Sequence, residues 1–235
     1  MTYLEHLSAL LGPLYTPPQG SGGHDLPHVL RMVRMYPEIA ELVPGVDETE
    51  YEITVWLHNI DRCPYYQARM GIKDLTATLY ELLEESGLGN EAQERIAQAV
   101  KEHNKRLDDA GDSPLLQALR LADKWDRIGV LGAISGFAWL GCVRPAYDPK
   151  DPFGYGSTVE ERWKTLYQNF YRILEWYADF PLIRELVHRH SWRFENLLRF
   201  IRAFGRELSY AHELPNKVED DIRKCLGVYY NEWLP

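Results

Sequence analysis

Apolar residues recur along most of the chain at spacings of three, four and seven positions, which is the spacing of one face of an α-helix. Clear examples are Leu26, Leu30 and Val33, then Ile96 and Val100, then Leu116 and Leu119. Runs in which apolar and polar residues alternate, as they do in half-buried strands, are scarce. The pattern therefore predicts a fold that is all-α, or very nearly so.

Two irregular stretches interrupt the helical pattern. Residues 16–23 (TPPQGSGG) separate a short N-terminal helix from the next one, and residues 144–157 contain three prolines and two glycines. This density of proline and glycine excludes a regular helix, so 144–157 is expected to be a loop. Long amphipathic patterns return in 158–230. We expect one domain over 1–235, with its core in 20–140 and a C-terminal helical extension.

Composition and charge narrow the class of protein. Hydrophobic residues make up 45% of the 235 residues, which is enough to fill a sizeable core. No apolar run approaches the roughly 18 residues that span a membrane, so no membrane contact is expected. The net charge of −9 argues against general nucleic-acid binding, but not against one phosphorylated small molecule in a locally positive pocket. Three widely spaced cysteines and an N-terminus without a signal-peptide pattern favour the cytoplasm.

Four segments place a polar side chain that can bind metal on an otherwise apolar helix face. These side chains are His28, His58, His103 and Asp123. A single histidine in such a position is more often a hydrogen-bonded core residue than a ligand, and Asp123 has an ordinary partner in Arg127, four residues later. A carboxylate is costly to bury unless it is paired or metal-bound, however. Together the four indicate a divalent metal site, for Mn, Fe, Ni, Zn or Mg.

Four short motifs follow one another along these segments. They are DLPHVLRMV (25–33), LHNID (57–61), EHN (102–104) and ADKWDRIG (122–129). In this order they resemble the HD superfamily of metal-dependent phosphohydrolases, whose helices surround one or two divalent metals. The resemblance covers roughly residues 20–140 and continues faintly into 185–207. It implies an all-α, HD-domain-like helical bundle and a metal-centred active site.

The resemblance implies His28, His58 and Asp123 as metal ligands, and it places Asn59 where the family pattern has an aspartate ligand. Asparagine keeps one acceptor oxygen but lacks the negative charge, so the site holds a dication less tightly and leaves the ion more strongly Lewis acidic. Asp61, three residues after His58, is in place to supply a replacement carboxylate. The alternative is that Asp61 pairs with a neighbouring cation.

Several further residues near the motifs are candidates for handling the substrate. Arg31 and Arg62 are expected to bind its phosphate, with Lys124 and Arg127 beside the reacting group. Each of these cations has an ordinary alternative as a solvated or ion-paired surface residue. His103 is expected to steady the substrate, transfer a proton or complete a second metal site, and the alternative is a histidine that only caps a helix end.

The expected function is therefore that of a metal-dependent phosphohydrolase acting on a phosphorylated small molecule, with a nucleotide as one candidate. In this reading Asp61, His103, Lys124 and Arg127 are catalytic. Asn59 motivates a second reading, a degenerate HD domain that binds a nucleotide or a protein partner without turnover. A third reading is an all-α interaction protein whose inward polar residues form only a hydrogen-bonded network. The oligomeric state stays open, a homo-oligomer included.

Overall fold

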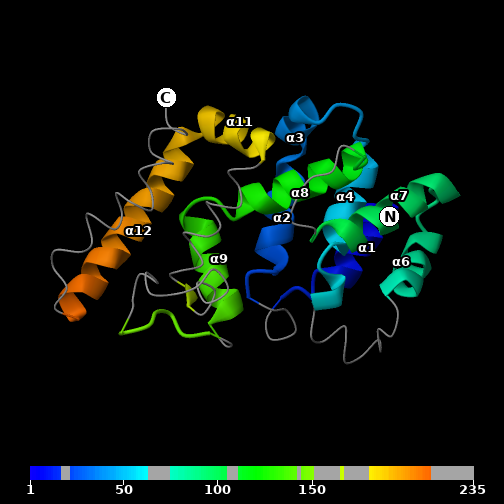
Figure 1. Ribbon diagram of the computed structural model, residues 1–235. Helices are drawn as coiled ribbons and strands as arrows, with labels where there is room; N and C mark the ends of the chain where they lie inside the picture. Colours follow the sequence, from blue (N-terminus) through cyan, green and yellow to red (C-terminus); the bar gives the residue numbers. More distant parts are fainter. Residues whose placement is uncertain are drawn as a thin grey trace. The chain divides into compact units, whose positions relative to one another are not determined.

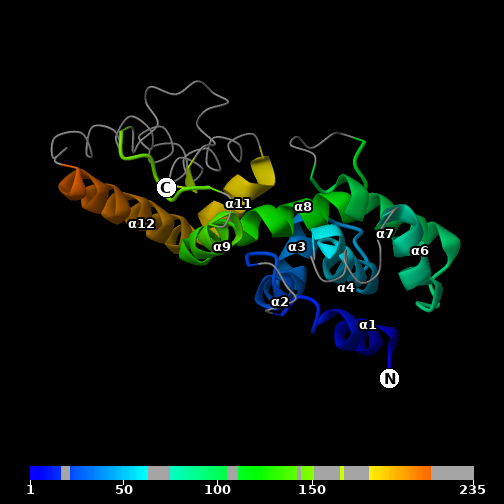
Figure 2. The same ribbon diagram turned by 90° about the horizontal axis from the view of Figure 1, so that it is seen from below.

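The structure is a computed structural model that describes residues 1–16, 22–62, 75–104, 111–141, 144–150, 165–166 and 180–212. Every regular element in these ranges is a helix, which confirms the all-α prediction (Figures 1 and 2). The chain divides into two compact units, Met1–Asp126 and Arg127–Pro235. The expectation of a single domain over 1–235 stays a prediction.

The first unit contains seven α-helices and one short 3-10 helix in its described part. They are α1 (Tyr3–Leu11), α2 (Leu26–Arg34), α3 (Tyr36–Leu42), α4 (Glu48–Leu57), η1 (Ile60–Arg62), α6 (Leu75–Glu84), α7 (Asn90–Glu102) and α8 (Pro114–Asp126). Helix α4 packs against α1, α2, α3, α7 and α8, and α8 packs against α2, α3, α4 and α7 (Figure 1). The helices that carry the sequence motifs therefore meet in one core.

Side chains at the helix starts explain where several of these helices begin. Thr2 opens α1 with a capping box, and Asp47 accepts a hydrogen bond of 2.9 Å from the backbone N–H of Glu50. Asp25 caps α2 by accepting from the backbone N–H of His28 at 3.1 Å. The aspartate of the DLPH motif thus fixes the start of the helix that presents His28.

Two tyrosines tie the core of the first unit together. The Tyr51 hydroxyl donates to the Met32 carbonyl at 2.8 Å, and the Tyr15 hydroxyl donates to the Trp56 carbonyl at 2.8 Å. Each bond satisfies a buried phenol and a backbone acceptor from a distant part of the chain. The first connects α4 to α2, and the second connects α4 to the segment after α1. These bonds fix α4, which ends immediately before His58.

The described part of the second unit contains α9 (Val130–Leu140), α11 (Pro181–Arg189) and α12 (Ser191–Ala211), and α12 packs against both others. The amphipathic pattern expected to continue through residues 181–208 is divided into two helices at His190, where the backbone leaves the helical region. The apolar spacing continues across His190, so the sequence pattern does not reveal this break.

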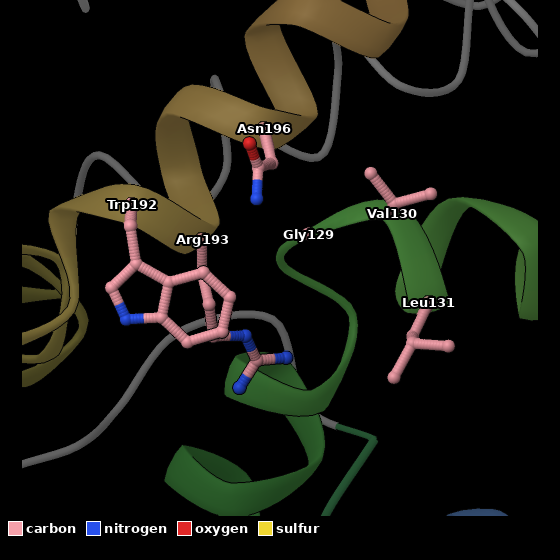
Figure 3. Close-up of a pocket in the computed structure, with 6 residues that line it drawn as sticks. All are labelled: Gly129, Val130, Leu131, Trp192, Arg193 and Asn196. Carbon is pink, nitrogen blue, oxygen red and sulfur yellow. The ribbon is translucent and has the colours of Figure 1, made fainter.

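A small hollow lies between α9 and α12 (Figure 3). Its volume is about 120 Å³, and it is lined by Gly129, Val130, Leu131, Trp192, Arg193 and Asn196. The Arg193 guanidinium donates to the Ile128 carbonyl at 2.7 Å and passes close to Gly129. None of the predicted site residues lines this hollow.

Residues 144–150 contain no regular helix, as expected for the start of the 144–157 loop. Residues 151–157 and most of the expected helices in 158–230, other than those in 181–212, lie outside the described residues. Within the described ranges no helix combines the length and the apolar character needed to cross a bilayer.

Gly129 is expected to be required for the stability of the second unit. It has φ +107° and ψ 176°, a region that is essentially restricted to glycine, and an added Cβ would lie 3.4 Å from Arg193 Nε. Gly129→Ala should lower the free energy of unfolding by about 1–3 kcal/mol. The matched control is Gly89→Ala, at a negative φ with no atom within 4 Å of the added Cβ. Equal losses for both variants in thermal unfolding would contradict this prediction.

Candidate metal centre

Two buried histidines and one buried aspartate converge in the first unit. His28 lies on α2, His58 directly follows α4, and Asp123 lies on α8. His28 Nε2 is 3.2 Å from His58 Nε2 and 3.6 Å from Asp123 Oδ1, and one ligand atom of each residue lies within 4.8 Å of the others. The side chains are almost closed to solvent, with exposed fractions of 2%, 0% and 7%. Three residues far apart in the sequence are thus brought together.

Hydrogen bonds determine which ring nitrogen of each histidine faces the cluster. His28 Nδ1 is 2.7 Å from Asp126 Oδ2, and His58 Nδ1 is 2.6 Å from the Val55 carbonyl oxygen. An ionised carboxylate and a carbonyl oxygen only accept, so a neutral ring at either position carries its proton on Nδ1. The Nε2 lone pairs then point toward each other. This is the arrangement of histidines that bind a metal through Nε2.

The spacing of these atoms fits a single cation. Metal bonds of about 2.0–2.2 Å to histidine nitrogen and carboxylate oxygen separate neighbouring ligand atoms by about 3–3.5 Å. The separation of 3.2 Å lies in that range, and the separation of 3.6 Å is just above it. Two imidazoles and one carboxylate suit a first-row transition metal such as Mn, Fe, Ni or Zn. The donor set therefore fits a divalent metal without selecting one.

Asp126 holds His28 in place from the side opposite the cluster, and it was absent from the residues expected at the site. Its carboxylate also accepts two hydrogen bonds from Arg31, of 2.7 Å from Nε and 2.8 Å from Nη2. Burial favours the protonated form of Asp126, but the bonds from Arg31 and His28 outweigh burial and lower its pKa. The expected role of Arg31 in substrate binding stays a prediction, because these contacts make it a partner of Asp126.

Burial keeps His58 and His103 neutral. It holds the pKa of His58 well below 6.5, and the neighbouring His28 and His103 lower it further. Burial also lowers the pKa of His103, whose Nδ1 is 2.6 Å from the Val100 carbonyl and whose ring centroid is 5.5 Å from that of His58. Neutral imidazole is the form that binds a metal. Both rings are therefore ready for coordination or proton transfer near neutral pH.

Asn59 presents its carboxamide to the cluster. Its Nδ2 lies 2.6 Å from His58 Nε2, whereas its buried Oδ1 has no hydrogen-bond partner in the described part of the chain. A buried carbonyl oxygen without a partner is costly. A half-turn about the Cβ–Cγ bond exchanges the two atoms and directs the oxygen toward His58. Asn59 can therefore donate to His58 or offer an oxygen ligand, and the two orientations have opposite effects on metal affinity.

The remaining residues expected at the site are not members of the group formed by His28, His58 and Asp123. Asp61 and Arg62 lie in η1, and Asp61 is not part of the group formed by the two histidines and Asp123. The charge of Asp61 acts on His103 and opposes the lowering of its pKa by burial. Lys124 is buried in α8, and Arg127 belongs to the second unit. Catalytic roles for these residues stay predictions.

A polar cluster that contains Arg62 adjoins the metal centre. Arg62 Nη1 donates to His24 Nε2 at 3.0 Å, and Nη2 donates to Asn104 Oδ1. The ring centroids of His24 and His28 are 6.1 Å apart. His24 and Asn104 were not identified from the sequence. His24 directly precedes the DLPHVLRMV motif and Asn104 is the last residue of EHN, but neither belongs to an apolar helical face.

No protein-family model matches this sequence, and no curated protein matches it either. Solved structures do match the fold. A protein from Lactobacillus plantarum is 19% identical with a TM-score of 0.65, and the match covers 88% of this chain and 97% of that chain. Bacillus subtilis YpgQ, solved in complex with ADP, is 19% identical with a TM-score of 0.60 over 87% and 97% of the two chains. The Lin1889 protein from Listeria innocua is 17% identical with a TM-score of 0.57 over 88% and 95%. These similarities show a shared fold.

Asn59 variants are expected to change the metal affinity in opposite directions. Asn59→Asp adds an anionic ligand and should tighten Mn²⁺ and Zn²⁺ binding by about tenfold or more, whereas Asn59→Ala should weaken it by about tenfold because an oxygen ligand is lost. Competition titration against a chromophoric chelator measures both. Asn196→Ala, which removes a carboxamide in the second unit, is the control. Tighter binding by Asn59→Ala would show that the amide only competes for His58.

The pH dependence of stability should report the buried neutral histidines. In the presence of a chelator, the unfolded chain takes up protons near pH 6.5, whereas His58 and His103 do so only at lower pH when folded. The free energy of unfolding should therefore fall as the pH decreases from 6.5 to 5, by up to about 1.4 kcal/mol per pH unit for each histidine. Urea unfolding at several pH values measures this slope. His103→Gln should flatten it, and a flat wild-type profile would contradict the assignment.

Proposed function

We propose that this chain is a metal-dependent phosphohydrolase that acts on a phosphorylated small molecule. The observation that carries the proposal is the buried group of His28, His58 and Asp123, whose ligand atoms lie within 4.8 Å of one another. The order of its motifs resembles that of the HD superfamily. A nucleotide is the first substrate to test, which is supported by the similar fold of Bacillus subtilis YpgQ, solved with ADP.

In the proposed mechanism, hydrogen bonds and burial set the position and the surroundings of the metal-binding atoms before a metal or substrate binds. When bound, a divalent metal supplies an activated water and neutralises charge on phosphoryl oxygens. Asp126 and the Val55 carbonyl orient the two histidines, so the ligand atoms need no rearrangement of the rings. Burial of the group excludes bulk water and strengthens electrostatic interactions with an anionic substrate.

His103 is the proposed proton acceptor. Its Nδ1 proton is directed to the Val100 carbonyl, so the lone pair of the neutral ring is on Nε2. Its ring makes an edge contact with His58, at a centroid distance of 5.5 Å. A neutral imidazole at this position can take a proton from an attacking water near neutral pH.

A second candidate is the same fold acting as a nucleotide-binding protein without turnover. Asn59 supports this candidate, because the amide withholds one negative charge from the metal centre and contacts His58 Nε2 at 2.6 Å. The two candidates share a metal and a ligand and differ only in chemistry. Direct measurement of hydrolysis therefore separates them.

Protein purified without chelator and supplemented with Mn²⁺, Ni²⁺, Zn²⁺, Fe²⁺ or Mg²⁺ is expected to release phosphate or pyrophosphate from a panel of phosphomonoesters and nucleotides. His58→Gln should abolish measurable turnover, and Asp126→Asn should lower metal affinity or activity by about 10–100-fold because His28 loses its anionic partner. His6→Gln, at an exposed position on α1, is the control.

The outcomes of this assay distinguish the two candidate functions from each other and from a purely structural hydrogen-bonded network. Metal binding without hydrolysis of any member of the panel would favour the non-catalytic candidate. No metal binding after supplementation would contradict both candidates and leave a hydrogen-bonded network as the role of these residues.

A further inference from the structure

Arg62 is held by two uncharged acceptors. Its guanidinium donates from Nη1 to His24 Nε2 at 3.0 Å and from Nη2 to Asn104 Oδ1. In the described ranges it forms no ion pair with a carboxylate. Arg95 in the same unit shows the more usual arrangement, with bonds of 3.1 and 2.5 Å to the carboxylate of Glu50. The positive charge of Arg62 is thus oriented by its contacts without being neutralised by them.

The oriented charge lies next to the candidate metal centre. His24 is four residues before His28 on the approach to α2, and their ring centroids are 6.1 Å apart. Arg62 follows His58 by four residues, and its charge contributes to lowering the pKa of His103, although less than burial does. His24 is buried, Arg62 is half-buried and Asn104 is exposed. The cluster therefore connects the buried centre with the surface.

We infer that His24 and Asn104 are positioning residues that form a neutral clamp on Arg62 and direct it to the phosphoryl group of a substrate at the metal centre. This inference rests on the proposed function. A guanidinium carries five N–H donors in a fixed plane, so the two contacts to the clamp leave three for an oxyanion. A carboxylate in place of either clamp residue would offset the charge that attracts the phosphate. The ligand class is a phosphate monoester or the terminal phosphate of a nucleotide.

The clamp also joins three segments of the first unit, the approach to α2, the end of η1 and the residues after α7. A purely structural role is therefore the competing explanation. The two explanations predict different results for a substitution that keeps the hydrogen-bond acceptor at position 104 but gives it a negative charge. Asn104→Asp turns the contact into an ion pair, which preserves or strengthens the link between the segments but neutralises Arg62.

The test measures the affinity of the full-length protein for inorganic phosphate and for ADP by calorimetry, and KM and kcat on any substrate that is hydrolysed. Asn104→Asp is expected to weaken phosphate and ADP binding by about tenfold or more while the melting temperature stays equal or rises. Arg62→Ala should cause at least the same loss, and His24→Ala a smaller one that His24→Gln partly restores. The effect should fall on KM, with metal affinity unchanged. Arg95→Ala is the matched control for the loss of an arginine.

Unchanged phosphate affinity in Asn104→Asp and Arg62→Ala would overturn the inference, and so would an equal loss in Arg95→Ala. A protein that binds phosphate and ADP through Arg62 but hydrolyses nothing would contradict the proposed function and leave the clamp intact. A protein that hydrolyses phosphate esters with a KM insensitive to these variants would contradict the clamp alone.

Discussion

The carboxylate of Asp126, enclosed between Arg31 and His28, is the interaction on which the rest of the site depends. A carboxylate that is only 2% exposed is strongly unfavourable unless its charge is paired and its oxygens are hydrogen-bonded. Three bonds of 2.7–2.8 Å meet that requirement, and they join α2 to the end of α8. The same bonds fix the proton of His28 on Nδ1. The charge compensation that makes burial of Asp126 tolerable thus also orients the first expected metal ligand.

The sequence was sufficient to predict the helical architecture and the three clustered residues, because His28, His58 and Asp123 stand at helical spacing from apolar residues. It was not sufficient for Asp126. That residue follows Asp123 by three positions on the same face, but its partners come from α2, and no local pattern identifies a contact between distant helices. His24 and Asn104 were missed for another reason. They lie outside the helices, where periodicity gives no direction to a side chain, and only the tertiary contacts of Arg62 show their placement.

Asn59 and the neutral clamp on Arg62 both make the charge of the site more positive. With asparagine at position 59 the group carries one carboxylate, that of Asp123, so a bound dication keeps a net positive charge. Arg62 adds a second positive charge that its neutral partners do not offset. The expected cost is weaker retention of the metal, and the expected gain is stronger attraction for an anionic substrate. In the proposed function, these two features are expected to favour binding of phosphate over tight binding of metal.

The overall charge of −9 is compatible with attraction of a phosphate to this site, because salt screens distant surface charges more strongly than nearby, partly buried ones. At physiological ionic strength, charges separated by more than about 8 Å in solvent are largely screened, whereas partly buried pairs are screened much less. Binding of a phosphate in the proposed function should therefore depend on Arg62 and on the metal centre, and the distant acidic surface should contribute mainly to the rate of approach. The same screening argument is the reason why an acidic chain is not expected to bind nucleic acid, whose many phosphates lie along an extended surface, while binding of a single phosphorylated ligand stays compatible with the charge.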